Sequence, residues 1–391
     1  MNFRQRSTPA ERLRLGFVGG GLDSGIGSTH RYAATLDGQF EIVAGVFSRD
    51  AARNAAAGAA IGIAPDRLYG DFETMARAEA ARADGIHAVA IATPNAQHVP
   101  AALAFLAAGI DVICDKPLAT DLAEARRLAA ALRPDGPGFV LTHNYSGHAM
   151  VREARERVAA GEIGAVRVVQ VEHAAGFGTH PLERAGAKAL AWRTDPAQAG
   201  VSSVLLDVGT HAHQLARYIT GLEVAEVAAD VNTLVEGRGS DDNAHALLRF
   251  DSGARGSLWA SIVAAGNRHG LKISVYGSKA ALHWNQEQPE ELVIAPQDGP
   301  RVVVRRGEPW TSDAAKRATR IKAGQAEGVL EAFANIYSDA AELIRARRFG
   351  TEASDHARRV PGAADGVKGL AFVEACVRSA RAGGGWTAVA Q

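Results

Sequence analysis

Three side chains in this sequence have the types and spacing needed for acid–base chemistry. Lys116 lies near the end of the short, largely apolar run Gly109–Pro117, which finishes with Asp-Lys-Pro. Ligands of parallel sheets bind at the carboxyl ends of strands, so an ammonium group held there is a candidate chemical group. Asp207 and His211 lie four residues apart, which places both side chains on one face of a helix. A carboxylate next to an imidazole can orient the ring and favour its protonated form.

Each of these side chains also has an ordinary structural explanation. Lys116 could be a solvated surface lysine, and Asp207 with His211 could be a pair on an exposed helix surface. Apolar neighbours would partly bury the pair, and burial lowers the pKa of an imidazole while the carboxylate raises it. The outcome for His211 is left open at this point. His213 falls on the other side of the same helix, so we expect it at the surface.

The elements that would position Lys116 alternate between strand and helix patterns. Strand patterns occur at Leu13–Val18, Phe40–Phe47, Ala88–Ala92, Asp111–Cys114 and Gly138–Thr142. Helical patterns separate them, and one of these can begin at His30. This alternation predicts a doubly wound parallel sheet.

The pattern changes near residue 144. A strand follows a helix that ends around Ala160, and after the helical segment Val204–Ile219 the strand-like runs follow one another without intervening helices. These strands are expected at Val166–His173, Val224–Val235, His245–Phe250, Ala254–Val263 and Leu271–Tyr276. Such runs predict a largely antiparallel sheet. We therefore expect one domain at 1–143 and a second at 144–391. The polar stretch Gln286–Lys322 is expected to be an exposed excursion.

A glycine-rich segment, Gly16–His30, follows the first strand and precedes a helix. Glycines there allow the backbone to approach a pyrophosphate, whose charge the helix N-terminus favours. Gly19 and Gly21 fit the first two positions, but the third falls on Ser24. Gly27 can serve as the last glycine if the loop is three residues longer. The alternative is a glycine-rich turn without a ligand.

The end of the second strand should distinguish NAD from NADP. An acidic residue there selects NAD, and an arginine accommodates a 2′-phosphate. Ser48 and Arg49 lean towards NADP, but Arg49 could equally stack on adenine or face water. The cofactor is therefore expected to be NAD or NADP.

Four segments in register give the chain a family resemblance. They are Gly27–His30, Thr93–His98, Asp115–Pro117 and Asp207–His211. In order and spacing they resemble motifs of the glucose-fructose oxidoreductase, inositol dehydrogenase and MocA (Gfo/Idh/MocA) family. The likeness runs from about Leu13 to Tyr276.

The resemblance implies a Rossmann domain, a C-terminal α/β domain with an open sheet, and a nicotinamide cofactor. It also implies oxidation of a hydroxyl group on a sugar, sugar derivative or inositol, by a homodimer or homotetramer packed through the open sheet. By position, Lys116, Asp207 and His211 match the catalytic trio of the family. The expected cofactor-binding residues are Gly19, Gly21, Ile26, Gly27, Ser48, Arg49, Thr93, Asn95, His98, Asp115, Lys116 and Asn144. The expected substrate-binding residues are Lys116, Tyr145, Trp192, Arg193, Asp207 and His211.

The chain departs from the family pattern in both of its predicted domains. Asp115 replaces the usual glutamate, and Val201–Ser203 occupies the place of a glycine triplet. The main expectation is an NAD(P)-dependent polyol dehydrogenase. One alternative is an NAD-dependent enzyme that cleaves glycosides through transient oxidation of the sugar. A non-catalytic nucleotide sensor is a further alternative, although it would not need a proton-handling trio.

The composition of the chain limits the kinds of binding partner that we expect. The 43 basic and 43 acidic residues among 391 cancel, which gives no reason to expect nucleic acid or an anionic membrane as a partner. Two cysteines cannot build a disulfide framework. The N-terminal residues lack the apolar core of a signal peptide, and no run approaches the roughly 20 apolar residues of a membrane span. We expect a cytoplasmic protein without a metal site.

Overall fold

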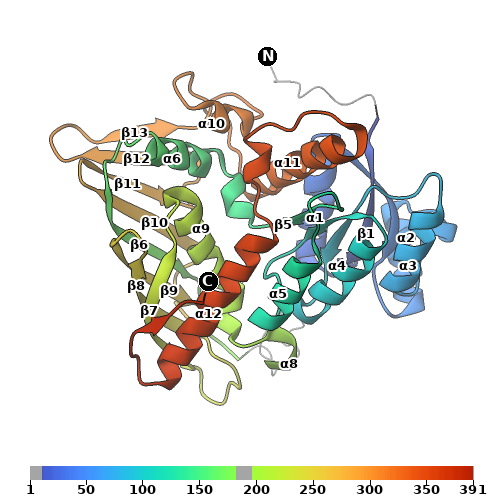
Figure 1. Ribbon diagram of the computed structural model, residues 1–391, viewed down its shortest axis with the longest axis horizontal. Coiled ribbons are helices and arrows are strands. Elements are labelled where there is room, and N and C mark those ends of the chain that lie inside the picture. The colour runs from blue at the N-terminus through green and yellow to red at the C-terminus, as the bar shows by residue number, and fades with distance from the viewer. Residues whose placement is uncertain (1–10, 182–195, 391) are drawn as a thin grey trace.

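Five parallel strands form the first sheet, in the spatial order β2-β1-β3-β4-β5. They are β1 (Leu13–Gly19), β2 (Phe40–Val46), β3 (Ala88–Ala92), β4 (Asp111–Cys114) and β5 (Phe139–Leu141). The computed structural model describes residues 11–181 and 196–390, and Figure 1 shows this sheet and its helices on the right. The strand order changes direction between β1 and β3, which opens a crevice at their carboxyl ends.

Five helices connect these strands, so the predicted doubly wound parallel sheet is confirmed. They are α1 (Gly25–Leu36), α2 (Ala51–Ile61), α3 (Phe72–Ala81), α4 (His98–Ala107) and α5 (Leu122–Ala131). Helix α1 begins at Gly25 rather than at His30, because Ser24 Oγ accepts a hydrogen bond from Gly27 N at 3.1 Å and caps the helix. Helix α3 was not predicted, although Asp71 caps it in the same way.

Nine strands form the second sheet, in the order β13-β12-β11-β10-β6-β9-β8-β7-β14. The bounds are β6 (Val166–Ala174), β7 (Val224–Asn232), β8 (Asn243–Phe250), β9 (Arg255–Ser261), β10 (Gly270–Gly277), β11 (Ala280–Asn285), β12 (Glu291–Pro296), β13 (Val302–Arg305) and β14 (Thr387–Ala388). Only the β6–β9 pair among them is parallel. The prediction of an open, mostly antiparallel sheet is confirmed.

The prediction for the segment Gln286–Lys322 was wrong. It contributes β12, β13 and helix α10 (Asp313–Arg317) to the domain. Leu292 is completely buried, and the buried Arg306 binds Glu290 at 2.6 Å and Glu327 at 3.0 Å. Short edge strands separated by polar turns bury too few apolar residues to produce a long periodic pattern, so the sequence alone looked like a loop.

The remaining helices cover one face of the second sheet and return to the first. They are α6 (Ala149–Ala159), α8 (Pro196–Ala199), α9 (Thr210–Thr220), α11 (Val329–Phe349) and α12 (Ala363–Arg381). Figure 1 shows α9 and α12 beside the second sheet, while α12 also packs on α5 and α11 packs on α1. We propose that the chain divides into domains near residue 143, with α11 and α12 crossing that division.

Helix α9 is buried on more than one side. It packs on β6 and β10 and also contacts α6 and α12. His213 is therefore buried, and its ring stacks on Phe372 of α12 with 4.4 Å between ring centroids. The expected surface position of His213 was wrong because α12 covers the side of α9 that carries it.

Charged side chains fasten α11 to its neighbours inside the protein. Asp37, after α1, accepts hydrogen bonds from Arg320 at 2.7 Å and from Ser338 at 2.7 Å. Arg152 of α6 and Asp339 of α11 form a buried ion pair at 2.6 Å, and Arg317 also contacts Asp339. Within residues 11–181 and 196–390, no helix has the length and apolar character needed to cross a membrane.

We expect the buried Arg152–Asp339 pair to stabilise the fold. Replacing Arg152 by methionine leaves Asp339 buried with Arg317 as its remaining cation. This should lower the free energy of unfolding by about 3 kcal/mol, because a buried charge that loses its most buried partner is costly. Denaturant unfolding measures the change.

A matched control removes an exposed pair. Arg305→Ala disrupts the Arg305–Glu291 pair, in which both partners are exposed, and should cost less than about 1 kcal/mol. Combining Arg152→Met with Asp339→Leu should recover part of the lost stability. Equal losses for Arg152→Met and Arg305→Ala would show that the buried pair has no special role.

Candidate active site

A cavity of about 380 Å³ lies where the loops after the first sheet meet the second domain. Its walls come from the glycine loop, the loops after β3, β4 and β5, the second sheet, and α11. The lining residues are Ile26, Thr29, Thr93, Asn95, Asp115, Lys116, Asn144, Tyr145, His173, Phe177, Asp207, Val208, His211, His269, Gln286, Val329 and Phe333. The cavity therefore brings together the predicted trio and several of the predicted cofactor residues.

Lys116 connects the two halves of this cavity. It lies two residues beyond the end of β4. Its Nζ donates hydrogen bonds to the backbone oxygen of Asp207 at 2.6 Å and to Asp207 Oδ1 at 3.1 Å. Both side chains are only 14% exposed, so the pair is partly shielded from water. The predicted lysine and aspartate thus meet across the domain boundary.

The helix that carries Asp207 and His211 begins with an unusual turn. Residues Leu205–Gly209 are π-helical, and α9 continues from Thr210. Single π-helical turns change the backbone hydrogen bonding of a helix and are frequent at functional sites. Here the backbone oxygen of Asp207 accepts its bond from Lys116, and both Asp207 and His211 line the cavity.

His211 is a buried, neutral imidazole. It is 8% exposed, and its Nδ1 has no hydrogen-bond partner among the residues described. Burial, followed by Lys116 and the neighbouring histidines, lowers the pKa of His211 well below its ordinary value. The sequence left open whether burial or the carboxylate would dominate this pKa; burial dominates, and the carboxylate pairs with Lys116.

Uncharged rings form the wall next to His211. The ring of Tyr145 meets that of His211 edge to face at 4.7 Å, and its hydroxyl lies 2.5 Å from His269 Nε2. His173 Nδ1 lies 3.2 Å from the carbonyl of Val208. Burial lowers the pKa of His173 to about 3, so the ring is neutral near pH 7. This wall offers hydrogen bonds without net charge.

The glycine loop has the geometry of a dinucleotide site. Gly19 and Gly20 have φ angles of 79° and 64°, in the left-handed region that glycine adopts easily. A Cβ on Gly27 would lie 2.3 Å from Gly20 Cα, so Gly27 allows α1 to approach the loop. A Cβ on Gly21 would come within 3.1 Å of the Phe47 carbonyl. Gly27 thus has the packing role of the last glycine, and these residues fit a bound pyrophosphate.

The residues after β2 differ in how far their side chains are already engaged in hydrogen bonds. Asp50 caps α2 by accepting a hydrogen bond from Arg53 N at 2.8 Å. Ser48 is half-buried, accepts a bond from Asp50 N, and precedes the exposed Arg49. That Ser48 and Arg49 meet a 2′-phosphate stays a prediction, as does the choice between NAD and NADP.

The motif Thr93–His98 serves two purposes. Thr93 and Asn95 line the cavity, whereas the ring of His98 is buried, 2.7 Å from the Pro117 carbonyl and 3.0 Å from the Thr93 carbonyl. His98 therefore ties the loop after β3 to the loop that carries Lys116. His98 does not line the cavity, and its contact with the cofactor stays a prediction.

Asp115 is a charged residue inside the cavity wall. Thr142 Oγ1 donates to Asp115 Oδ1 at 3.0 Å, and His30 Nε2 lies 3.4 Å from the same oxygen. Burial alone would raise the pKa of Asp115, but His30 and Lys116 outweigh it and lower the pKa to about 2. The shorter carboxylate is thus held as an anion beside Lys116.

Some lining residues were not predicted, and two predictions cannot be placed. Trp192 and Arg193 lie outside the described residues. His173 follows Val169 and Val171 on the buried face of β6, an alternation that could have identified it as an inward-facing polar residue. His269 and Gln286 come from turns and have no comparable local signal. Among residues 11–181 and 196–390, no group of three or more potential ligands is arranged to bind a metal.

Two family models match the chain. The model described as an oxidoreductase family with an NAD-binding Rossmann fold covers residues 13–157, and that of the GFO/IDH/MocA C-terminal domain covers residues 151–283. The uncharacterized oxidoreductase YfiI of Bacillus subtilis is 37% identical over 378 residues, 96% of each chain.

Solved structures agree over nearly the whole chain. An inositol dehydrogenase homologue from Azotobacter vinelandii, in complex with NADH and myo-inositol, has a TM-score of 0.90 and 37% identity, covering 97% of this chain and 98% of that one. An oxidoreductase from Sinorhizobium meliloti has a TM-score of 0.87 and 44% identity, covering 96% and 99%.

The matched ranges contain all four motifs found in the sequence. The glycine loop, Thr93–His98 and Asp115–Pro117 lie in the first range, and Asp207–His211 lies in the second. The chain belongs to the Gfo/Idh/MocA family of oxidoreductases, and its first sheet is the family's NAD-binding Rossmann domain.

Proposed function

We propose that this protein is an NAD(P)-dependent dehydrogenase that oxidises a ring hydroxyl group of a cyclic polyol, namely a sugar, a sugar derivative or an inositol. The convergence of Lys116, Asp207 and His211 on one cavity supports this most directly. Ile26 and Thr29, from the first turns of α1 beside the glycine loop, line the same cavity. The cofactor and the proton-handling groups would therefore meet in one enclosed space.

The protein's own residues would manage the proton and the charge. A nicotinamide cofactor, when bound, would supply the acceptor for the hydride that leaves the carbon bearing the hydroxyl group. His211 is neutral and can accept the hydroxyl proton on a ring nitrogen. Lys116 would stabilise negative charge on the substrate oxygen, and Asp207, 3.1 Å away, orients the ammonium group.

The uncharged wall suits an uncharged, hydroxyl-rich substrate. Tyr145, His173, His269 and Gln286 can donate or accept hydrogen bonds, as hydroxyl groups also can. Lys116 is the only lysine or arginine among the described lining residues. The structure of a homologue with myo-inositol bound supports a cyclitol as the first substrate to test.

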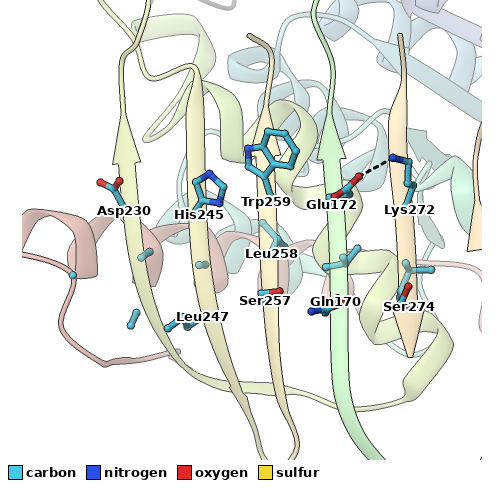
Figure 2. Close-up of a pocket in the computed structure, with 16 residues that line it drawn as sticks. Gln170, Glu172, Asp230, His245, Leu247, Ser257, Leu258, Trp259, Lys272 and Ser274 are labelled. Carbon is cyan, nitrogen blue, oxygen red and sulfur yellow. Dashed lines mark ion pairs between the residues drawn. The ribbon is translucent and has the colours of Figure 1, made fainter. Parts of the chain in front are cut away.

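We also propose that the protein forms a homodimer or homotetramer through the open face of the second sheet. Figure 2 shows side chains of neighbouring strands on this face, with the Glu172–Lys272 ion pair at one side. A groove of about 610 Å³ runs across them, lined by Leu247 and Trp259 among others. Paired charges and an exposed leucine suit burial against a second copy of the sheet.

The first prediction concerns the reaction itself. Purified protein, offered cyclitols, aldoses and glycosides with NAD⁺ or NADP⁺, should accumulate NADH or NADPH with at least one of them. Lys116→Met and His211→Gln should each lower turnover by roughly two to four orders of magnitude, because each removes a proton-handling group.

His213→Gln is the matched control for that experiment. His213 is a buried histidine on the same helix as His211, but it does not line the cavity. Its replacement should therefore lower stability and leave turnover nearly unchanged. If the protein cleaves glycosides without net formation of reduced cofactor, the dehydrogenase hypothesis is wrong. The alternative, an enzyme that cleaves glycosides through transient oxidation of the sugar, then takes its place. Neither reduction nor cleavage with any substrate would refute both.

The second prediction concerns the charge state of His211. Because burial and Lys116 lower its pKa well below the ordinary value, the ring should stay neutral in the range in which an ordinary histidine titrates. Lys116→Met removes the positive neighbour, so the pKa of His211 should rise while the burial effect remains. NMR of the ¹⁵N-labelled imidazole rings measures both values.

His213 provides an internal reference in the same spectra. Burial and Arg217 lower its pKa, and Lys116 is not among the main causes. Its titration should therefore be the same in Lys116→Met as in the unaltered protein. If His211 titrates normally before the substitution, its assignment as a neutral base is wrong.

The third prediction concerns assembly. Leu247 is 56% exposed on the groove face, and Leu247→Arg should reduce the molar mass measured by light scattering, because it places an unpaired charge in the interface. Val302→Arg makes a similar change at the β13 edge, where Val302 is 47% exposed, and should leave the mass unchanged. A monomeric parent protein would contradict the proposed interface.

A further inference from the structure

The helix that carries Asp207 and His211 begins on a carboxylate from elsewhere in the domain. Asp241 lies in the connection between β7 and β8. Its Oδ1 accepts hydrogen bonds from Ser203 N at 2.5 Å and Val204 N at 3.2 Å, and its Oδ2 accepts one from Ser202 Oγ. The first amides of a helix lack partners within the helix, and a carboxylate is a favourable acceptor for them.

The serine in this cap links the carboxylate to the next turn. Ser202 Oγ donates to Asp241 and accepts from Leu205 N at 3.2 Å. Glycine, which the family pattern would place here, has no hydroxyl group for either bond. The departure from that pattern at Val201–Ser203 thus coincides with a cap that depends on Asp241.

The segment just before the helix is held by the cofactor domain. Asn95 Nδ2 donates to the Ala199 carbonyl at 3.1 Å, and Val201 N donates to the Thr120 carbonyl at 3.1 Å. Gly200 has a φ of 104°, and a Cβ there would lie 2.5 Å from the Thr120 oxygen. The helix start is therefore fixed between the first domain on one side and Asp241 on the other.

The position of the helix start matters because Lys116 contacts two different oxygens of Asp207. Both the backbone oxygen, at 2.6 Å, and Oδ1, at 3.1 Å, lie within hydrogen-bond distance of Nζ. Rotating the helix or sliding it along its axis would break one of these contacts. Asp207 lies only three residues beyond Val204, the last amide that Asp241 holds.

We propose that Asp241 is a positioning residue for the reaction, acting through the helix start on the contact between Asp207 and Lys116. The proposal rests on the function proposed above. Asp241 does not line the active-site cavity, so it acts at a distance from the reacting atoms.

The hydrogen bonds from the start of the helix are the main interactions that compensate the buried negative charge of Asp241. Burial and the neighbouring Asp242 raise the pKa of Asp241, while Ser202 and the two backbone amides lower it. Asp242 is itself paired with Arg238 at 3.0 Å, and Arg381 lines the small hollow beside Asp241. The capping hydrogen bonds are therefore what hold this carboxylate at the helix terminus.

Two substitutions distinguish the loss of the hydrogen-bond acceptor Oδ1 of Asp241 from the loss of its negative charge. Asp241→Ala removes all three bonds and should lower kcat about 10²-fold, the loss expected when reacting groups are displaced by about 1 Å. The Kd for NADH should change little, because the glycine loop is untouched. Asp241→Asn keeps Oδ1 for Ser203 and Val204 and should retain most of the turnover. The assay uses myo-inositol, or whichever polyol in the panel turns over fastest.

Asp71→Ala is the matched control. Asp71 caps α3 with a 2.6 Å bond from Thr74 N, and α3 contributes no residue to the cavity. This variant should lose a comparable cap yet keep its turnover. The proposal is overturned if Asp241→Ala keeps its kcat, if Asp241→Asn is as impaired as alanine, or if Asp71→Ala loses turnover equally.

Hydrogen exchange separates this proposal from the proposed function. If the unaltered protein oxidises no polyol, the function fails, and Asp241 is judged on the backbone amides of residues 203–211. Asp241→Ala should speed their exchange, and Asp241→Asn should do so much less. Unchanged exchange in Asp241→Ala would overturn the positioning role whatever the substrate.

Discussion

One ammonium group connects the two domains of this protein at the point where chemistry would occur. Nζ of Lys116 comes from the strand end of the Rossmann sheet and is bound by two oxygens of Asp207, 91 residues further along the chain. In a partly buried setting such a pair persists only when its geometry is well supported. Much of the surrounding structure supplies that support: His98 ties the Lys116 loop to its neighbour, and the π-helical turn presents Asp207.

Burial decides the electrostatics of the site. His211 lies among Tyr145 and other histidines and next to Lys116, and all of these surroundings oppose a positive ring. The neutral imidazole and the fixed ammonium group suit different roles: the ring can accept a proton, while the cation can stabilise negative charge. Asp115 is a second carboxylate near Lys116, and His30 and that lysine keep it ionised. Among the described lining residues, one ammonium group is therefore combined with two carboxylates, while His173 and His211 stay uncharged.

Local signals in the sequence were sufficient for most elements and insufficient for a few. Buried strands such as β3 and β4 are continuous apolar runs, and such runs are recognisable because both faces of a parallel sheet are covered. Strand β13 forms one edge of the second sheet and β12 lies next to it; both are short and partly exposed, so the segment that contains them resembled a loop. His213 was misplaced for a related reason: the periodicity of α9 shows which residues share a face, but not that α12 covers the second face.

The sequence by itself determined the order of the motifs, the glycine loop after the first strand, and the identity of Lys116, Asp207 and His211 as candidates. These features are local, because strand ends, helix caps and an i, i+4 spacing depend on a few neighbouring residues. Only the tertiary structure decided that Asp207 pairs with Lys116, that burial keeps His211 neutral, and that His173 and His269 join the wall. It also placed Asp241 at the start of the helix that carries Asp207 and His211. Contacts between residues far apart in the chain depend on how whole elements pack against one another, and the pattern within a single element carries no information about its neighbours.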